Sequence, residues 1–432
     1  MSVAAPVTPS FKIRHFRWWI AGLLLLASIL NYLDRNTVAV LAPSIQEDLG
    51  ISDQQYGHVM SFFMVAYTIA YLCSGWLVDW LGARISLALF VGWWAVANSL
   101  TGFARGVGSL GISRFMLGLG EAGGYTASPK VVAEWFPAKD RGIAVGIYSV
   151  GGALGAVIAP LLVVGLAGHL GWRGVFAVTP LFGLGFVALW LWIYRKPEEH
   201  RWLTEEERAL ILTERKQDDG ATKDQTWRRR WSEILRNPAV WALMFARLLT
   251  DPVWYFLNFW LPKYMHTERH LEQGQLSRIW VVYLAADVGF LAAGFISGWF
   301  VKHGTESMAS RRRVLLGAAC LVPFAPLIAL TPTVGGSFAF AALVALAHTA
   351  WLSSISTYIV DLVPKRILAT AFGFIAAGSA AGGIMMNEAV GWVVTHHSYR
   401  PVFYAMIGLH PVAFALIWLF ARKPWGQSTA RI

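Results

Sequence analysis

The chain has 432 residues, of which 56% are hydrophobic and only 14% are Asp, Glu, Lys or Arg. Soluble domains carry about 25% charged residues, so this composition excludes an ordinary soluble enzyme and favours a membrane protein. The formal net charge of +11 comes from Lys and Arg residues that collect between apolar segments, which argues against a nucleic-acid-binding protein.

Apolar stretches recur along almost the whole chain, each close to the ~20 residues that cross a bilayer as a helix. We predict twelve spans, with starts near residues 17, 55, 84, 107, 141, 172, 237, 275, 312, 334, 367 and 400. The first run has no clean small-residue cleavage site, so it is expected to be a permanent helix rather than a signal peptide. Cys73 and Cys320 lie in apolar segments and imply no disulfide framework. The predicted fold class is an all-α membrane protein.

The first span carries Asp34 and Arg35 side by side near its middle, within the stretch NYLDR. Each such charge costs roughly 2.5–3.5 kcal/mol at the centre of a membrane helix, and intramembrane charges usually face a cavity or a partner. Asn31 precedes them by one helical turn, so the three residues are expected to share one face.

The fourth span carries Arg114 and Glu121 on one helical stripe, roughly 10 Å apart along the axis. A direct pair within the helix is strained at this separation, so each is expected to face another partner across a cavity. The alternative is a structural salt bridge to the first span. Gly118 lies between them, in a glycine-rich stretch that favours close helix packing over ligand binding.

Residues 195–236 form the one clearly polar stretch, which is expected to link an amino-terminal six-helix bundle (1–194) to a carboxy-terminal six-helix bundle (237–432). Thr204 and Glu207 make a capping-box pattern that predicts a short surface helix here. Most Lys and Arg residues fall on the side that would be cytoplasmic if the amino terminus is inside, so both termini are expected in the cytoplasm.

In the seventh span Arg247, Asp251, Trp254 and Asn258 share one face, and Pro252 interrupts the backbone hydrogen bonds beside them. Broken helices near the midplane often mark ligand sites, so Trp254 and Asn258 are expected to contact a bound ligand. Two plainer interpretations remain: Arg247 and Asp251 neutralise each other, and the tryptophan is a packing residue.

Internal repetition supports two related halves. The sequence SGWLVD at 74–79 recurs as SGWFVK at 297–302, 223 positions later. The pattern at 134–137, acid-x-x-Pro, recurs at 361–364, 227 positions later. Similar offsets from unrelated motifs indicate a duplicated six-helix unit, as in parallel-repeat transporters.

The stretch GWLVDWLGAR at 75–84 closely resembles the signature of the major facilitator superfamily between its second and third helices. NYLDR at 31–35, SRFMLGLGEAGGYTASPKVVAEWFP at 113–137 and LTDPVWYFLNFWLPKYM at 249–265 resemble the anion:cation symporter family, most of all its hexuronate and sugar-acid transporters. The resemblance covers essentially the whole chain. It implies twelve helices in two pseudo-symmetric bundles, with the substrate between them and rocking alternating access.

The resemblance also assigns roles to individual residues. It implies proton coupling at Asp34 and Glu121, and a conformational latch at Gly75, Asp79, Gly82 and Arg84. With the seventh span, it gives the substrate-binding set Tyr32, Arg35, Tyr67, Arg114, Trp254, Asn258 and Asn387. For a sugar acid, Trp254 and Asn258 are expected to contact hydroxyls, with the indole stacked on the pyranose face.

Charges within the predicted spans suggest how transport is coupled. Four bases and four acids lie there: Arg35, Arg114, Lys130, Arg247, Asp34, Glu121, Asp251 and Asp287. A bound carboxylate would add one negative charge, and protonation of Glu121 or Asp34 would restore neutrality. His348 lies among hydroxyl residues and is expected to be a satisfied structural histidine rather than a proton relay.

The expected function is proton-coupled symport of a sugar-acid anion, with H⁺ as the coupling ion and Na⁺ as the alternative. The alternatives are a carrier of another organic carboxylate, such as a phthalate-like aromatic acid, and a non-transporting membrane sensor. An enzyme is not expected, because the chain has no metal-ligand spacing, nucleophile elbow or phosphate-binding loop. The remaining expectations are no cofactor, no nucleic acid, a functional monomer and a multi-pass location in a bacterial inner membrane.

Overall fold

The computed structural model describes residues 12–218, 227–364 and 367–422. These residues are almost entirely helical, and the described part holds no β-strand beyond a single bridge between Ile13 and Leu203. The expectation of an all-α membrane protein is confirmed.

The long helices are α1 (Phe16–Val40), α3 (Asp53–Thr101), α4 (Val107–Trp135), α5 (Ala138–Ile193), α8 (Pro238–Phe259), α10 (Trp280–Lys302), α11 (Ser307–Leu321), α13 (Val334–Leu362), α14 (Leu368–His396) and α15 (Arg400–Phe420). Shorter elements join them: α2 (Ala42–Leu49), α6 (Glu205–Asp218), α7 (Trp227–Leu235), α9 (Leu261–Thr267), α12 (Leu327–Leu330), η1 (Pro197–Glu199), η2 (Gln273–Ile279) and η3 (Val322–Phe324).

Two of these helices each contain two of the predicted spans. In α3 the break lies at Gly82, with φ of 76°, and in α5 it lies at Gly171, with φ of 64°. Both angles fall in the left-handed region that favours glycine. With these two breaks, each of the twelve predicted spans corresponds to a helical segment that starts within a few residues of its predicted position.

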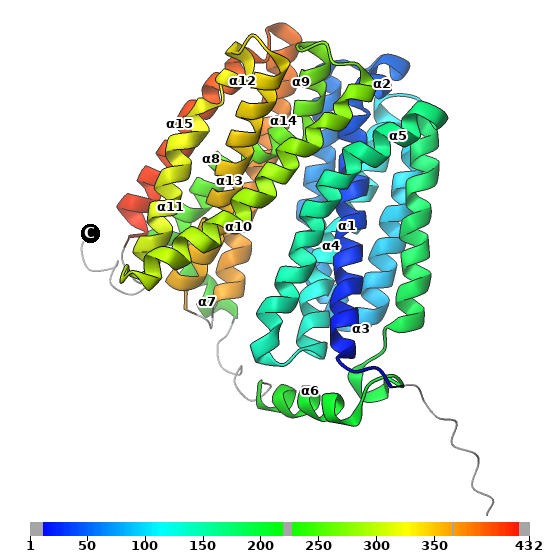
Figure 1. Ribbon diagram of the computed structural model, residues 1–432, viewed down its shortest axis with the longest axis vertical. Helices are drawn as coiled ribbons and strands as arrows, with labels where there is room; N and C mark the ends of the chain where they lie inside the picture. Colours follow the sequence, from blue (N-terminus) through cyan, green and yellow to red (C-terminus); the bar gives the residue numbers. More distant parts are fainter. Residues whose placement is uncertain (1–11, 219–226, 365–366, 423–432) are drawn as a thin grey trace, which may run out of the picture.

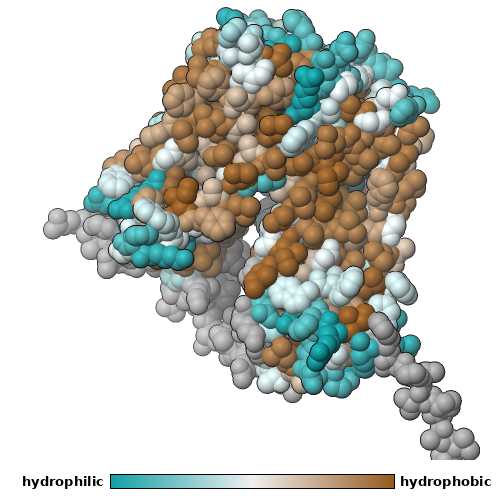
Figure 2. All heavy atoms as spheres, viewed as in Figure 1, coloured by the Kyte–Doolittle hydropathy of each residue, from teal (hydrophilic) through white to brown (hydrophobic). Residues whose placement is uncertain are grey.

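Seven helical segments of the described chain are long and apolar enough to cross a membrane by length and composition. The helices α4 and α8 are not among them, because polar residues such as Glu121 and Asp251 lower their mean hydropathy. Figure 2 shows a broad apolar belt between two more polar ends. Large aromatic side chains such as Phe103 and Phe295 are more than three-quarters exposed on the protein surface, as expected for side chains that face lipid.

The helices form two groups, α1 to α5 and α8 to α15, which lie close together near α2 and α9 and part toward α6 and α7 (Figure 1). At the closed end, the Tyr56 hydroxyl donates to the Phe259 carbonyl at 3.0 Å, and Lys263 forms an ion pair with Asp53. A Cβ on Gly57 would lie 2.6 Å from the Asn387 carbonyl oxygen. The two groups therefore touch through backbone at this end and separate at the other.

The polar linker begins as a helix that is fixed to the first bundle. Thr204 accepts from the Glu207 amide at 3.3 Å, as the capping pattern predicts. The helix was expected to run through Leu212, and α6 continues to Asp218. The Glu207 carboxylate accepts from the Phe16 amide at 2.9 Å and from the Arg17 guanidinium at 2.7 Å. Glu207 thus neutralises the amino end of α1, where helix amides favour a negative charge.

Close packing inside the first bundle gives a stability prediction. A Cβ on Gly118 of α4 would lie 2.5 Å from the Phe63 carbonyl oxygen of α3, so Gly118→Ala must push these helices apart. Overpacking of this kind costs about 1–3 kcal/mol, and we expect a clear fall in the thermal midpoint of the detergent-purified protein. Gly22→Ala is the matched control, because a Cβ there meets nothing within 4 Å. Equal midpoints for the two variants would contradict this packing.

Candidate functional site

A cavity of about 280 Å³ lies between the two helix groups. Both groups contribute to its wall, and its charged and titratable members are Arg35, Arg247, Asp251 and His348. The remaining lining residues are aromatic, small or apolar: Tyr32, Met64, Tyr67, Thr68, Tyr71, Trp254, Tyr255, Leu352, Phe372, Gly373, Ala376, Ala377, Ser379 and Ala380. Such an enclosure, mostly apolar with a few convergent polar groups, is typical of small-molecule sites.

A second, smaller pocket of about 30 Å³ shares part of the cavity wall and lies toward the closed end. Arg35 of α1 and Trp254 of α8 line both pockets, and Asn258 lines only the smaller one. Arg35 and Trp254 thus belong to the six residues that the two pockets share, and they come from opposite helix groups.

Arg35 is the cation that the first bundle presents at this wall. Its Nε donates to Glu121 Oε2 at 2.7 Å, and its guanidinium carbon lies 5.0 Å from the Tyr32 ring centre and 4.9 Å from that of Tyr67. The side chain of Arg35 is 14% exposed, whereas that of Glu121 is fully buried behind it. The salt bridge between the fourth and first spans, the plainer of the two interpretations, is thus present in this structure. Its arginine nonetheless faces the cavity.

Asp34 lies in the interior of the first bundle and not at the cavity. Asn98 donates to Asp34 Oδ1 at 2.7 Å and accepts from Arg114 Nη2 at 2.8 Å, so one amide joins the acid to the base. Arg114 Nη2 also donates to the Thr101 hydroxyl, and the arginine stacks on Phe176. Arg114 was expected to face the substrate cavity, but it is almost fully buried and is not among the lining residues of the cavity. Its Nη2 is bound to Asn98 and Thr101 of α3, whereas its Nε and Nη1 have no hydrogen-bond partner among the described residues.

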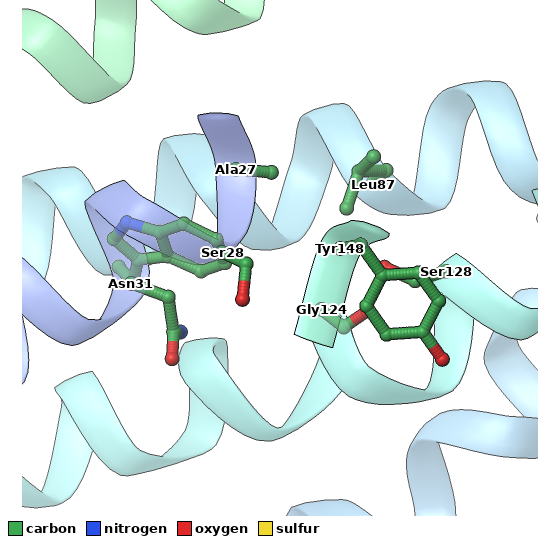
Figure 3. A pocket seen from close by; sticks show the side chains of 8 residues that line it. Ala27, Ser28, Asn31, Leu87, Gly124, Ser128 and Tyr148 are labelled. Carbon is green, nitrogen blue, oxygen red and sulfur yellow. The ribbon is translucent and has the colours of Figure 1, made fainter. Parts of the chain in front are cut away.

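The first bundle also contains a third, very small pocket of about 20 Å³, shown in Figure 3. Asn31, Ser128 and Tyr148 lie around it on separate helices. A space of this size holds about one water molecule. It is therefore too small for an organic substrate.

In the second bundle, Arg247 and Asp251 form an ion pair within α8, with Nε to Oδ2 at 2.8 Å. The plainer interpretation of this pair is therefore the one observed, although both side chains line the cavity. Trp254 lies one turn further on, and Asn258 donates to its carbonyl at 2.8 Å. Pro252 lies within α8, which continues through it.

Asn387 lies apart from both pockets. Its Oδ1 accepts from the Trp260 indole at 3.0 Å and it is fully buried near the closed end. It is placed to hold α14 against α8 rather than to line the cavity as expected.

The predicted latch lies at the opposite end of the first bundle. Gly82 forms the break in α3, and Arg84 donates to the Leu191 carbonyl at 2.6 Å. Gly75 lies within the first part of α3, while the Asp79 side chain is outside the described part of the structure. Lys130 donates to the Val78 carbonyl at 3.0 Å, so α4 is tied to the same segment.

Two participants were not assigned a site role from the sequence. Asn98 joins Asp34 to Arg114, and its only sequence signal is an amide within an apolar run. His348 was expected to be structural, yet it lines the cavity.

Comparisons with known proteins agree with this architecture. Residues 24–386 match the Major Facilitator Superfamily. The chain is 30% identical over 418 residues to the hexuronate transporter of Escherichia coli strain K12, with 96% of each chain covered. It is 32% identical over 320 residues to the galacturonate transporter of Dickeya chrysanthemi, covering 73% of this chain and 91% of the relative.

Solved structures show the same fold. A bacterial homologue of the human lysosomal transporter Spinster, in an inward-facing occupied conformation, superposes with a TM-score of 0.75 at 19% identity, covering 98% of this chain and 100% of that chain. The inward-open xylose transporter XylE of E. coli gives 0.73 at 15% identity, covering 95% and 98%. With the family match over most of its length, the chain belongs to the Major Facilitator Superfamily and is a multi-pass membrane transporter rather than an enzyme.

Proposed function

We propose that this protein is a proton-coupled symporter that takes up a sugar-acid anion, a hexuronate or an aldonate. The single observation that carries the proposal is Arg35, a cation at the wall of the shared cavity that is held by a buried glutamate. The names of the relatives support the substrate class, because they include transporters of hexuronate and galacturonate. The aromatic walls beside Arg35 suit the apolar face of a sugar ring.

The coupling follows from competition for one guanidinium. Glu121 occupies Arg35 Nε at 2.7 Å, and a substrate carboxylate needs the same arginine. If both acids were ionised, the pocket would hold an excess negative charge in a low-dielectric region, which is costly. A proton on Glu121 removes that excess and leaves Arg35 for the substrate. The loaded site then has no more net charge than the empty one.

Alternating access would require the contacts between the two helix groups at the closed end to break and the helix groups to come together at the open end. The contacts to be broken include the Lys263–Asp53 pair, the His58–Glu388 pair and the hydrogen bond from Tyr56 to Phe259. We place the closed end outside the cell, with α6 and both termini in the cytoplasm of a bacterial inner membrane. A carrier of this kind would act as a monomer, with H⁺ as coupling ion and Na⁺ as the alternative to be tested.

Asp34 is the second proposed proton site. Its carboxylate is joined to Arg114 through Asn98, deep in the first bundle. A proton there would weaken the link between α1, α3 and α4 rather than compete with substrate. We therefore assign Asp34 to the conformational step and Glu121 to substrate binding.

The first functional prediction concerns Glu121. In proteoliposomes with an imposed inward proton gradient, wild type should concentrate labelled galacturonate, glucuronate or galactonate. Glu121→Gln should still exchange the substrate but lose accumulation against its gradient, because the amide keeps the shape and carries no titratable proton. Benzoate and phthalate test the aromatic-acid alternative, and a sodium gradient tests the other ion. Full accumulation by Glu121→Gln would contradict the coupling role.

The second functional prediction separates the two arginines of the first bundle. Arg35→Lys should raise the half-saturation concentration at least tenfold with the fold retained, because lysine lacks the planar fork that binds a carboxylate. Arg114→Lys should mainly lower the thermal midpoint, because its side chain is buried and bound to Asn98 and Thr101. Tenfold weaker binding by a fully stable Arg114→Lys protein would restore Arg114 as a substrate residue.

A further inference from the structure

Helices α4 and α13 correspond to each other in the two halves of the chain. Each has 29 residues; α4 runs from Val107 to Trp135 and α13 from Val334 to Leu362. Both ends are thus 227 positions apart, the offset already seen between the acid-x-x-Pro motifs. The residue 227 positions after Glu121 is His348. The second bundle therefore has a titratable side chain at the position that the proposed coupling glutamate occupies in the first.

Helices α1 and α8 correspond in the same way. Leu41 ends α1 directly before the proline-containing helix α2, and Trp260 ends α8 directly before the proline-containing helix α9. These two residues are 219 positions apart, and the residue 219 positions after Arg35 is Trp254. Arg35 contacts Glu121 in the first bundle, and its counterpart Trp254 stacks on His348 in the second, with ring centres 6.1 Å apart and planes 9° apart.

The duplicated scaffold thus holds two equivalent contacts of different chemistry. Arg35 and Trp254 line both pockets, from opposite helix groups, and His348 lines the larger one beside Trp254. An arginine suits a carboxylate. A flat indole with an imidazole stacked on it suits a sugar ring, with an apolar face for C–H groups and a nitrogen for a hydroxyl.

His348 is held in one orientation by a second buried histidine. Its Nδ1 lies 3.2 Å from His410 Nε2, and the His410 ring packs against Trp351 with centres 5.1 Å apart. Both histidines are fully buried. In this contact one nitrogen must donate and the other must accept. The role of His348 Nδ1 therefore decides whether Nε2 of the same neutral ring is an acceptor or a donor.

Nε2 of His348 has no hydrogen-bond partner among the described residues. A buried polar atom without a partner destabilises the fold, and an apolar aromatic residue would fill the same space without that cost. The neighbouring charges do not use it, because Arg247 and Asp251 are bound to each other. A purely structural role leaves this nitrogen unexplained.

We propose that His348, oriented by His410, is a specificity-determining residue that hydrogen-bonds a hydroxyl of the transported acid. The carboxylate binds Arg35 in the first bundle, and the hydroxylated ring lies against Trp254 and His348 in the second. This inference rests on the proposed sugar-acid function and deepens it. It states that the protein selects polyhydroxylated carboxylates over carboxylates of the same size without hydroxyls.

The test compares galacturonate with tetrahydropyran-2-carboxylate, which keeps the ring and the carboxylate but has no hydroxyls. Half-saturation concentrations for uptake are measured for wild type and for His348→Phe, which keeps a ring against Trp254 and removes the hydrogen bond. We expect a rise of about 10- to 100-fold for galacturonate and less than about threefold for the dehydroxylated acid. Retained transport of the dehydroxylated acid shows that the variant is folded.

His410→Leu is the second variant, because it leaves His348 in place and removes its orienting partner. Selectivity for galacturonate should fall in this variant too, by less than in His348→Phe. If wild type transports galacturonate and neither variant changes the ratio of the two half-saturation concentrations, the role of His348 is wrong and the proposed function stands. If wild type transports no sugar acid at all, the proposed function falls and this inference with it.

Discussion

A charge inside a membrane protein is costly unless it is neutralised nearby, and the arrangement around the cavity follows from that constraint. Arg35 is bound to Glu121, and Arg247 to Asp251. Asp34 reaches Arg114 through the amide of Asn98. Of these three arginines, Arg35 is the one that lies at the cavity wall and is bound to a fully buried glutamate. In the proposed mechanism, a substrate anion that binds Arg35 disturbs this charge balance, and one proton on Glu121 restores it.

Equivalent helices of the two halves line one shared cavity. Helices α4 and α13 have the same length and the same place in their halves, yet one carries Glu121 and the other His348 at equivalent positions. Backbone contacts at Gly57 bring the halves together at the closed end. Duplication therefore fixes the geometry of the cavity, while substitutions at equivalent positions give its two walls different chemistry.

The sequence was sufficient for the fold and for part of the site. Helix starts and the break at Gly82 follow from hydropathy and a glycine motif. The spacing of four residues offered the pairing of Arg247 with Asp251 as one of two interpretations, and the structure has this pair. The separate directions of Asp34 and Arg35 do not follow, because adjacent residues differ by about 100° around a helix and only tertiary packing sets the rotation of α1. Asp34 points into the first bundle, where it accepts a hydrogen bond from Asn98. Arg35 points to the cavity, where its guanidinium lies against the rings of Tyr32 and Tyr67. The inward position of Arg114 does not follow from the sequence for the same reason, since its partners Asn98 and Thr101 belong to another helix.

The most direct measurement of the central claim is proton uptake on substrate binding. The detergent-purified protein is placed in weakly buffered solution, and galacturonate is added while the pH is recorded. Coupling through a proton on Glu121 predicts that wild type takes up about one proton for each substrate bound, and that Glu121→Gln binds galacturonate without proton uptake. Binding by wild type with no proton uptake, or with the same uptake in Glu121→Gln, would contradict it.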